Sequence, residues 1–329
     1  RKTPDFAEMV FWELPAQDTQ LVGLKTGLLD TISITLDALP AVKDTEGIRI
    51  MQLPTTGVAG INVYGQSYVG IGTPDQAPNF DPGLAWVSSD PDINSEEWER
   101  ARKVREALSI SIDRELIVNT MLGGFGSASG MRDWAGHEDR LPPGLTWEFD
   151  QERAKRLLVE AGYPDGFPIT LTAAVRGAPS EIEVCDAIGQ MWKNIGLDVE
   201  LKRDSYGILR PQLINREYKG ATCHTVTIRL APVLALGNYL STSRFNWGAD
   251  HPILEEVILK ARGAISQSDR EKFELESVQF FYGHVLGGVG LYIFDGAVAV
   301  GPKIETLEDH VKRGGTHFNG FEWVRPRDN

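Results

Sequence analysis

Apolar residues recur along the first part of the chain at spacings that predict strands and helices in alternation. Three short apolar runs typical of strands cover residues 9–12, 28–34 and 48–53. Between the first two runs, Leu21 and Leu24 lie one helical turn apart, and Gly27 can end that helix in a left-handed conformation. A short helix is expected to begin at Leu36. Strands that alternate with helices indicate an α/β fold.

The same alternation continues beyond residue 93. Asn94 and Glu97 resemble a capping box for a helix through residue 112, and Asp113 and Asp150 are placed to cap two further helices. A strand over 169–175, a helix over 182–195 and a strand over 197–201 then predict a βαβ unit with parallel strands. The remaining predicted elements are a strand over 221–228 and two helices over 253–282, followed by an apolar run over 289–300 that returns the chain to the first lobe.

The pattern is interrupted between residues 66 and 92, where Gly, Pro, Asp and Ser predominate. We expect a crossing segment and loop there. The interruption divides the chain into a first part of lobe one at 1–65, lobe two at 93–288, and a return crossing with the second part of lobe one at 289–329.

Composition and charge restrict the class of protein. The chain has 329 residues, 42% hydrophobic and 24% charged, which is typical of a folded protein of more than one domain. The formal net charge of −13 repels phosphate backbones, so nucleic acid is not expected as a partner. No apolar run approaches the ~20 residues that span a bilayer. The first residues lack the apolar core of a signal peptide, so we expect that no export signal is present in this chain.

No catalytic or metal-binding motif is recognisable. The glycine-rich residues 124–130 follow a predicted helix and fit neither a dinucleotide fingerprint nor a nucleophile elbow. The histidines are scattered, and Cys185 and Cys223 lack the spacing of a zinc site. These absences predict no cofactor, no metal and no enzymatic activity. The sequence favours separate thiols over a disulfide but leaves the redox state of the two cysteines open.

Aromatic and hydrogen-bonding residues are concentrated in predicted loops. Binding pockets use such side chains because they combine apolar area with a polar tip. The alternative interpretation is that each aromatic residue anchors its own loop to the core. The candidate ligand-binding residues of this kind, with the neighbouring Arg244, are Tyr64, Tyr68, Trp134, Tyr239, Arg244, Phe245, Asn246 and Trp247.

Four segments resemble those of family 5 solute-binding proteins, the dipeptide and oligopeptide class that serves ABC importers. Residues 104–115 resemble the family segment VRxALxxAIDRxxI, and residues 149–167 are similar to yDxxkAkxLLxEAGYxdGF. Residues 24–30 resemble LkxGeiD, and residues 192–199 resemble wkxiGixv. The four motifs occur in family order and cover most of the chain.

The resemblance implies a periplasmic-binding-protein-like two-lobe α/β fold of the class with an extended second lobe. It further implies that a small solute of the peptide or peptide-like class is captured between the lobes and delivered to the permease subunits of an ABC transporter. The location is then periplasmic or at the cell surface. The family's usual N-terminal part has no counterpart here, so an N-terminally truncated form of the fold is expected.

One further candidate follows from the resemblance. Many peptide-binding members carry a WxxDxxDP-like stretch whose Asp holds the ligand's amino group. Counted back from Pro232, the corresponding Trp and Asp positions hold Thr225, Ile228 and Ala231, so that amine anchor is missing. Arg229 lies beside these positions, and we predict that it faces the cleft and pairs with an acidic or strongly hydrogen-bonding group of the ligand. The alternative interpretation is a solvated arginine at the end of a strand.

Two rival interpretations remain open. The first is an α/β hydrolase or transferase enzyme without a recognisable motif, which a turnover assay would distinguish from a binding protein. The second is a ligand-dependent sensor partner, which sequence alone does not separate from a transport component.

Overall fold

The computed structural model describes residues 3–14, 16–34, 36–176, 178, 180–229, 231–243, 248–307 and 321–327. They form two compact units. Unit 1 comprises Arg1–Thr56, Leu122–Gly126 and Phe294–Asn329, as far as these are described, and unit 2 comprises Gly57–Met121 and Ser127–Ile293. The long strands β2 (Arg49–Tyr64) and β7 (Gly288–Val300) each belong partly to both units. These boundaries differ from the predicted limits at 65 and 288, and the assignment of lobes stays a prediction.

Unit 1 has a small core of its own. Helix α1 (Gln17–Lys25), strand β1 (Thr31–Ile34) and the 3-10 helix η1 (Leu36–Ala41) precede β2, and β1 pairs antiparallel with the end of β7. Apolar side chains of α1, β1 and β7 pack together in this core. Gly27 has φ +75°, which confirms the predicted end of α1. The unit also contains β8 (Ile304–Thr306), the 3-10 helix η6 (Phe321–Trp323) and β9 (Arg325–Pro326).

The prediction of a strand over residues 9–12 is wrong. These residues lie in no strand, and their apolar side chains are exposed, with Trp12 at 58%. A strand requires hydrogen bonds from a neighbouring strand, and in the described part of the chain this segment pairs with none. An apolar run alone therefore does not define a strand.

The strands confirm the predicted α/β class. Within the described residues, seven strands form one sheet in the order β1–β7–β2–β6–β4–β5, with β3 (Gly126–Ala128) paired to β7. Strand β6 (Gly220–Val226) runs antiparallel to β2 and parallel to β4 (Pro168–Val175). Strand β4 is also parallel to β5 (Asp198–Ser205), and α5 (Glu181–Asn194) connects the two, which confirms the predicted βαβ unit.

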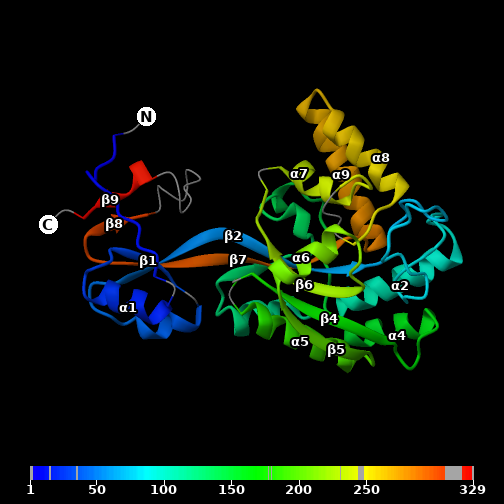
Figure 1. Ribbon diagram of the computed structural model, residues 1–329, viewed down its shortest axis with the longest axis horizontal. Helices are drawn as coiled ribbons and strands as arrows, with labels where there is room; N and C mark the ends of the chain where they lie inside the picture. The colour runs from blue at the N-terminus through cyan, green and yellow to red at the C-terminus, as the bar shows by residue number, and fades with distance from the viewer. Residues whose placement is uncertain are drawn as a thin grey trace. The chain divides into compact units, whose positions relative to one another are not determined.

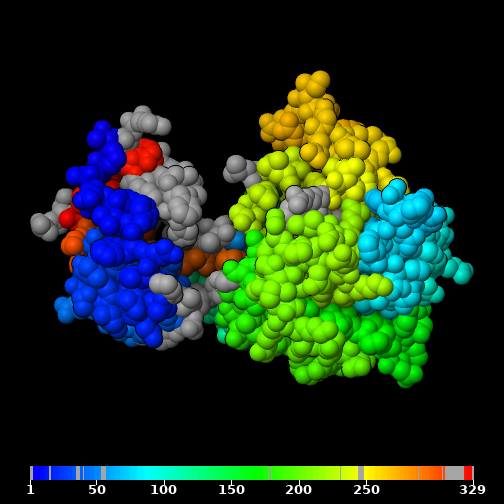
Figure 2. Space-filling view, viewed as in Figure 1, coloured from blue at the N-terminus to red at the C-terminus, as the bar shows by residue number. Residues whose placement is uncertain are grey.

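Helices cover both faces of the strands in unit 2. Figure 1 shows α4 (Gln151–Glu160) and α5 on one side of these strands and α7 (Pro232–Leu236), α8 (Pro252–Gly263) and α9 (Gln267–His284) on the other. The short helix α6 (Tyr206–Ile214) follows β5. In Figure 2 the pair α8 and α9, in gold, stands out from the surface of unit 2. Their inner side chains join a large apolar cluster that includes Trp98 and Tyr239.

A disulfide joins α5 to the sheet. Cys185 of α5 and Cys223 of β6 are bonded, with 5.9 Å between their Cα atoms. The expectation of separate thiols is therefore wrong. The physical reason is that α5 packs on β4, β5 and β6, which brings together two cysteines that are 38 residues apart in the sequence.

The α2–α4 pair shows how local signals fix helix starts. The side chain of Ser95 caps α2 (Glu96–Ile110) by accepting from the Trp98 amide at 3.2 Å. Asn94, the predicted cap, instead bonds to Asp92. Asp150 caps α4 as predicted, by accepting from the amide of the third helical residue at 2.7 Å.

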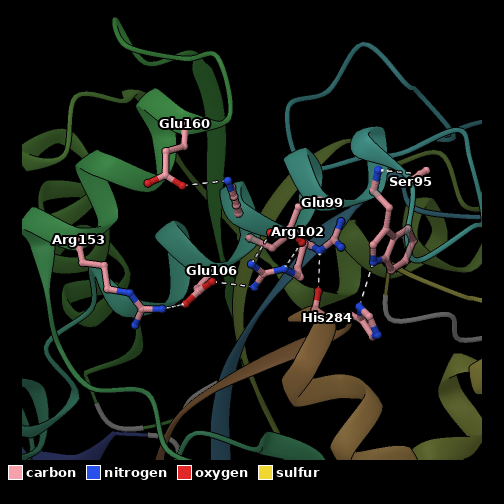
Figure 3. A network of polar contacts seen from close by, with 10 residues as sticks. Ser95, Glu99, Arg102, Glu106, Arg153, Glu160 and His284 are labelled. Atoms are coloured by element: carbon pink, nitrogen blue, oxygen red, sulfur yellow. Dashed lines mark hydrogen bonds and ion pairs between the residues drawn. The ribbon is translucent and has the colours of Figure 1, made fainter.

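The predicted cap at Asp113 is also confirmed. Its side chain begins α3 (Arg114–Leu116), which continues into the π-helical turn η2 (Ile117–Met121). Figure 3 shows Glu106 of α2 between Arg102 and Arg153, so one carboxylate links α2 to α4.

Two classes of feature are not found in the described part of the chain. None of its helices is long and apolar enough to cross a membrane. None of its groups of His, Cys, Asp and Glu is arranged to hold a metal ion.

Candidate functional site

A buried polar cluster forms where β2 and β6 pair in unit 2. The register places Asn62 opposite Thr222 and Gly60 opposite His224, so these positions share one face of the sheet. Cys223, between the two β6 residues, points to the other face and the disulfide. Successive residues of β6 therefore point to opposite faces of the sheet, one of which carries the disulfide and the other the polar cluster.

Arg132 is the centre of this cluster. It belongs to the 3-10 helix η3 (Arg132–Trp134), is 1% exposed, and lies across β2 at Gly60, where an added Cβ would come 2.5 Å from Arg132 Cδ. Its Nη1 donates to Asn62 Oδ1. Its Nη2 donates to Tyr239 OH at 2.8 Å and to Asp133 Oδ2 at 3.2 Å. The absence of a side chain at Gly60 thus makes room for a buried guanidinium.

The partners of Arg132 form a continuous network. Tyr239, in the 3-10 helix η5 (Gly237–Tyr239), donates from its hydroxyl to Asp133 Oδ2 at 2.5 Å. Asn62 Oδ1 accepts from Arg132, so its Nδ2 is a donor and faces His224 Nε2 at 3.4 Å. The proton of His224 then lies on Nδ1, which is 3.1 Å from Thr222 Oγ1. The network therefore requires a neutral His224.

The charge states agree with this assignment. Burial lowers the pKa of His224 well below its usual value, and the positive charges of Arg132 and Arg176 lower it further. Burial also acts to lower the pKa of Arg132, but the Asp133 carboxylate and the Tyr239 hydroxyl more than offset this and raise it. Burial raises the pKa of Tyr64, whose hydroxyl lies 3.3 Å from Thr222 Oγ1, to about 12. A fixed guanidinium paired with a carboxylate thus lies beside neutral hydrogen-bonding groups.

A shallow hollow opens beside this network on unit 2, with an empty volume of about 330 Å³ that includes the solvent above it. Arg132 and Asp133 contribute to one side of it. The remaining lining residues come from the turn after η3, the end of β6 with the segment that follows it, α7 and η5. They are Ala135, Val226, Thr227, Ile228, Arg229, Ala235 and Asn238. The hollow therefore combines charged, amide and hydroxyl groups with apolar walls, as ligand sites do.

Arg229 is the predicted site residue that lines this hollow. Its side chain is exposed, and its guanidinium makes no hydrogen bond or ion pair with any described residue. Its backbone carbonyl oxygen lies 3.1 Å from His137 Nε2, which holds the segment after β6 in place. An unpaired guanidinium at the rim of a hollow can bind an anionic group.

The predicted aromatic candidates are placed in the interior of unit 2. Tyr64, Trp134 and Tyr239 are each at most 1% exposed. The half-buried Tyr68 donates from its hydroxyl to the backbone carbonyls of Ser88 and Asp90, at 3.2 and 2.9 Å. Their role in ligand binding stays a prediction. Four other predicted residues lie outside the described residues: Arg244, Phe245, Asn246 and Trp247.

The polar residues of the hollow were not predicted from the sequence. Arg132, Asp133 and Asn238 lie in short 3-10 turns, where no periodic pattern marks them. The available signal was weak: an adjacent Arg-Asp pair in a segment otherwise rich in glycine and tryptophan. Only the fold brings residues 132 and 239 together.

Comparison with known proteins supports a family assignment. Residues 1–246 match the model of the bacterial extracellular solute-binding proteins, family 5 Middle. The glutathione-binding protein GsiB of Salmonella choleraesuis is 38% identical over 77 residues, which are 21% of this chain and 13% of that protein. The heme-binding protein A of Haemophilus influenzae is 29% identical over 106 residues, which are 29% of this chain and 18% of that protein.

Solved structures show the same fold. The periplasmic binding protein DppA of Helicobacter pylori, in complex with the peptide STSA, aligns with a TM-score of 0.65 at 16% identity and covers 96% of this chain. The putative peptide-binding protein AppA of Clostridium difficile aligns with a TM-score of 0.73 at 13% identity and covers 95% of this chain. The chain spans 56% and 60% of these two proteins.

The periplasmic-binding-protein-like fold is therefore confirmed, and so is the resemblance on which it was predicted. With three quarters of its length matched by the family model, the chain belongs to the bacterial extracellular solute-binding proteins of family 5.

Proposed function

We propose that this chain captures a small solute of the peptide or peptide-like class for an ABC importer. It then acts outside the cytoplasm, in the periplasm or at the cell surface, and delivers its ligand to the permease subunits. Family membership supports this proposal, as do the names of similar proteins, which refer to glutathione, heme and a bound tetrapeptide. The family is one of binding proteins and is not an enzyme class.

The observation that carries the proposal is the hollow on unit 2. Arg229, whose guanidinium has no partner among the described residues, lines this hollow together with the Arg132–Asp133 pair and apolar side chains. Such a surface offers charge, hydrogen bonds and apolar contact to a small ligand. It also rests on a rigid base, because Arg132 is held by partners on β2, η3 and η5. A pre-organised site binds more tightly because less conformational entropy is lost.

The rival function is a hydrolase or transferase. An incubation with glutathione and the dipeptide Met-Leu, followed by quantitative chromatography, distinguishes the two. A binding protein returns both compounds chemically unchanged, whatever the incubation time. Conversion of many molecules per chain would contradict the proposal and favour an enzyme.

Arg229 provides a sharper test of the site. We expect Arg229→Ala to weaken an acidic ligand by about 1.5–3 kcal/mol, the usual range for a hydrogen bond to a charged group. This corresponds to about tenfold or more in affinity. Glutathione, which carries two carboxylates, is the first probe for calorimetry.

Arg156 supplies the matched control. It is an exposed arginine of α4 that does not line the hollow. Arg156→Ala removes the same charge, so it reports any general effect of net charge on affinity. Equal affinities of the wild type and both variants would remove Arg229 from the site.

A further inference from the structure

Two histidines mark the two ends of the helical hairpin formed by α8 and α9, residues 252–284. His251 immediately precedes α8 and caps it, and His284 is the last residue of α9. The centroids of their rings lie 4.8 and 5.6 Å from that of Trp98, a fully buried residue of α2. Both ends of the hairpin therefore meet on one indole side chain.

The hydrogen bonds of both histidines require neutral rings. His251 Nδ1 accepts from the Ile253 amide at 3.2 Å, so its Nε2 carries the proton and donates to the Pro91 carbonyl at 3.0 Å. His284 Nδ1 accepts from Trp98 Nε1 at 3.0 Å (Figure 3). A protonated histidine has no acceptor nitrogen. Protonation of either ring therefore removes the acceptor and places two N–H groups against each other.

A buried positive charge lies beside these rings. Arg105 of α2 is 2% exposed, and its guanidinium carbon lies 4.9 Å from the centroid of Trp98. It donates to the backbone carbonyls of His284 at 3.1 Å and Trp86 at 2.8 Å, and no described carboxylate pairs with it. A charged histidine would thus lie beside a cation that no carboxylate neutralises.

Most of the surroundings oppose protonation. Burial, with the charges of Arg105, His251 and Arg102, lowers the pKa of His284 to about 4. Burial also lowers the pKa of His251. Glu99 acts in the opposite sense on His284, but its carboxylate is paired with Arg102 at 2.6 Å. The other titratable groups of this region are Tyr68, Asp90 and Glu97.

The end of α9 is strained and contacts the residues beneath the hollow. Val285, directly after His284, has φ +48°, a left-handed conformation that β-branched residues rarely adopt. Phe281, one turn earlier, packs edge-on against Tyr239 with 4.5 Å between ring centroids. Tyr239 in turn holds Arg132. Helix α8 packs on α7 and η5, which also line the hollow, so displacement of the hairpin reaches the hollow.

We propose that His251 and His284 form a pH-sensitive latch. With both rings neutral, the latch holds the α8–α9 hairpin on α2. Protonation in acid releases the hairpin and loosens the α7–η5 side of the hollow. The inference goes beyond solute capture, because it makes the conformation of unit 2 respond to the acidity of its surroundings, whichever solute is bound.

Proton linkage gives the direction and size of the effect. A released His284 titrates near pH 6.5, whereas the closed one has a pKa of about 4. Release therefore takes up protons and is favoured as the pH falls below about 6.5. The full difference corresponds to about thirtyfold in the opening equilibrium at pH 5. Because the ring is only half-buried and the α9 dipole favours a cation, we expect about tenfold.

Hydrogen exchange at pH 7.5 and pH 5, expressed as protection factors, tests the latch without a ligand. Residues 252–284 and 232–239 should lose about tenfold or more of their protection at pH 5. Strand β4 and helix α5, which neither histidine contacts, should lose less. The double variant His251→Asn, His284→Asn should keep hairpin protection equal at both pH values. Asparagine still caps α8 and still offers an acceptor to Trp98, but it does not titrate.

His224→Asn is the control, because it removes a buried neutral histidine outside the hairpin and should leave the acid release in place. Circular dichroism at pH 7.5 establishes folding, and each single variant should reduce the loss if the double variant does not fold. Wild-type hairpin protection that is equal at both pH values, or an equal loss in the folded double variant, would overturn the latch. A hairpin that opens while residues 232–239 stay protected would overturn its link to the hollow. None of these outcomes decides solute capture, which is measured by dialysis at pH 7.5.

Discussion

Arg132 is a charged side chain that unit 2 holds in its interior, and Gly60 determines whether it fits. A Cβ at position 60 would lie 2.5 Å from Arg132 Cδ and 2.9 Å from the carbonyl oxygen of Val289. The second atom belongs to the backbone and cannot rotate away. The position of Arg132 at the base of the hollow therefore depends on a glycine, because any side chain at position 60 would collide with it.

Gly60→Ala should lower the free energy of unfolding by roughly 1–3 kcal/mol, the usual cost of overpacking. Gly283→Ala is the control, because nothing lies within 4 Å of a Cβ there and the residue is helical. Alanine in a helix should be neutral or stabilise by about 0.5–1 kcal/mol. Denaturant unfolding measures both. A Gly60→Ala protein as stable as the wild type would contradict the close approach.

His224 gives a pH dependence of known sign. Its folded-state pKa is depressed by burial and by Arg132 and Arg176, whereas an unfolded histidine titrates near pH 6.5. The unfolded chain therefore gains a proton below about pH 6.5 that the folded chain does not. The stability that His224 contributes is present above this pH and is lost as the pH falls, by at most about 1.4 kcal/mol per unit.

His224→Asn should reduce this slope of stability against pH between pH 7 and 5.5, as measured by melting temperature. An identical slope in the wild type and the His224→Asn variant would show that His224 is not the neutral buried group described above.

The disulfide acts at the scale of elements, because it ties α5 to β6 across a separation of 38 residues. Both cysteines are buried, at 1% and 6% exposure. Replacing both with alanine should cost about 2–4 kcal/mol, the usual contribution of a disulfide that closes a loop of this length. Thermal melting of the two proteins measures the cost.

Thiol counting provides an independent check on the same bond. The denatured wild type should show no reactive thiol before reduction and two after it, because the chain has two cysteines. Two reactive thiols without a reductant would contradict the disulfide.

Elements defined by neighbouring residues could be predicted from the sequence. The caps at Asp113 and Asp150 act three residues along the chain, and the βαβ unit repeats apolar positions at short periods. Features that depend on residues far apart in the sequence could not be predicted. The strand expected at residues 9–12 has no described partner strand, and the disulfide depends on the packing of α5.

The candidate site was predicted only in part for the same reason. Arg229 was placed by resemblance, and the structure puts it in the hollow. Asp133 was not predicted, because its carboxylate is held by the hydroxyl of Tyr239, which lies 106 residues later in the sequence. Aromatic residues drew attention in the sequence, but Tyr64 and Tyr239 prove to support the polar network from the interior.

At the scale of the whole molecule, the net charge of the chain and the charge of the residues that line the hollow have opposite signs. The chain carries a formal net charge of −13, yet the hollow contains two arginines and one aspartate. The positive charge of the hollow attracts ligands with an anionic group to this place. The negative charge of the rest of the chain repels such ligands elsewhere. We therefore predict selective capture of such ligands at the hollow.

The most direct measurement is equilibrium dialysis of the purified chain against an extract of short peptides and small metabolites, with mass spectrometry of the retained compounds. We predict that the wild type and Arg156→Ala retain the same solute, chemically unchanged and at about one molecule per chain. Arg229→Ala should retain about tenfold less, as expected for a lost charged hydrogen bond. If the wild type retains no solute, or if all three proteins retain the same amount, solute capture in this hollow is contradicted.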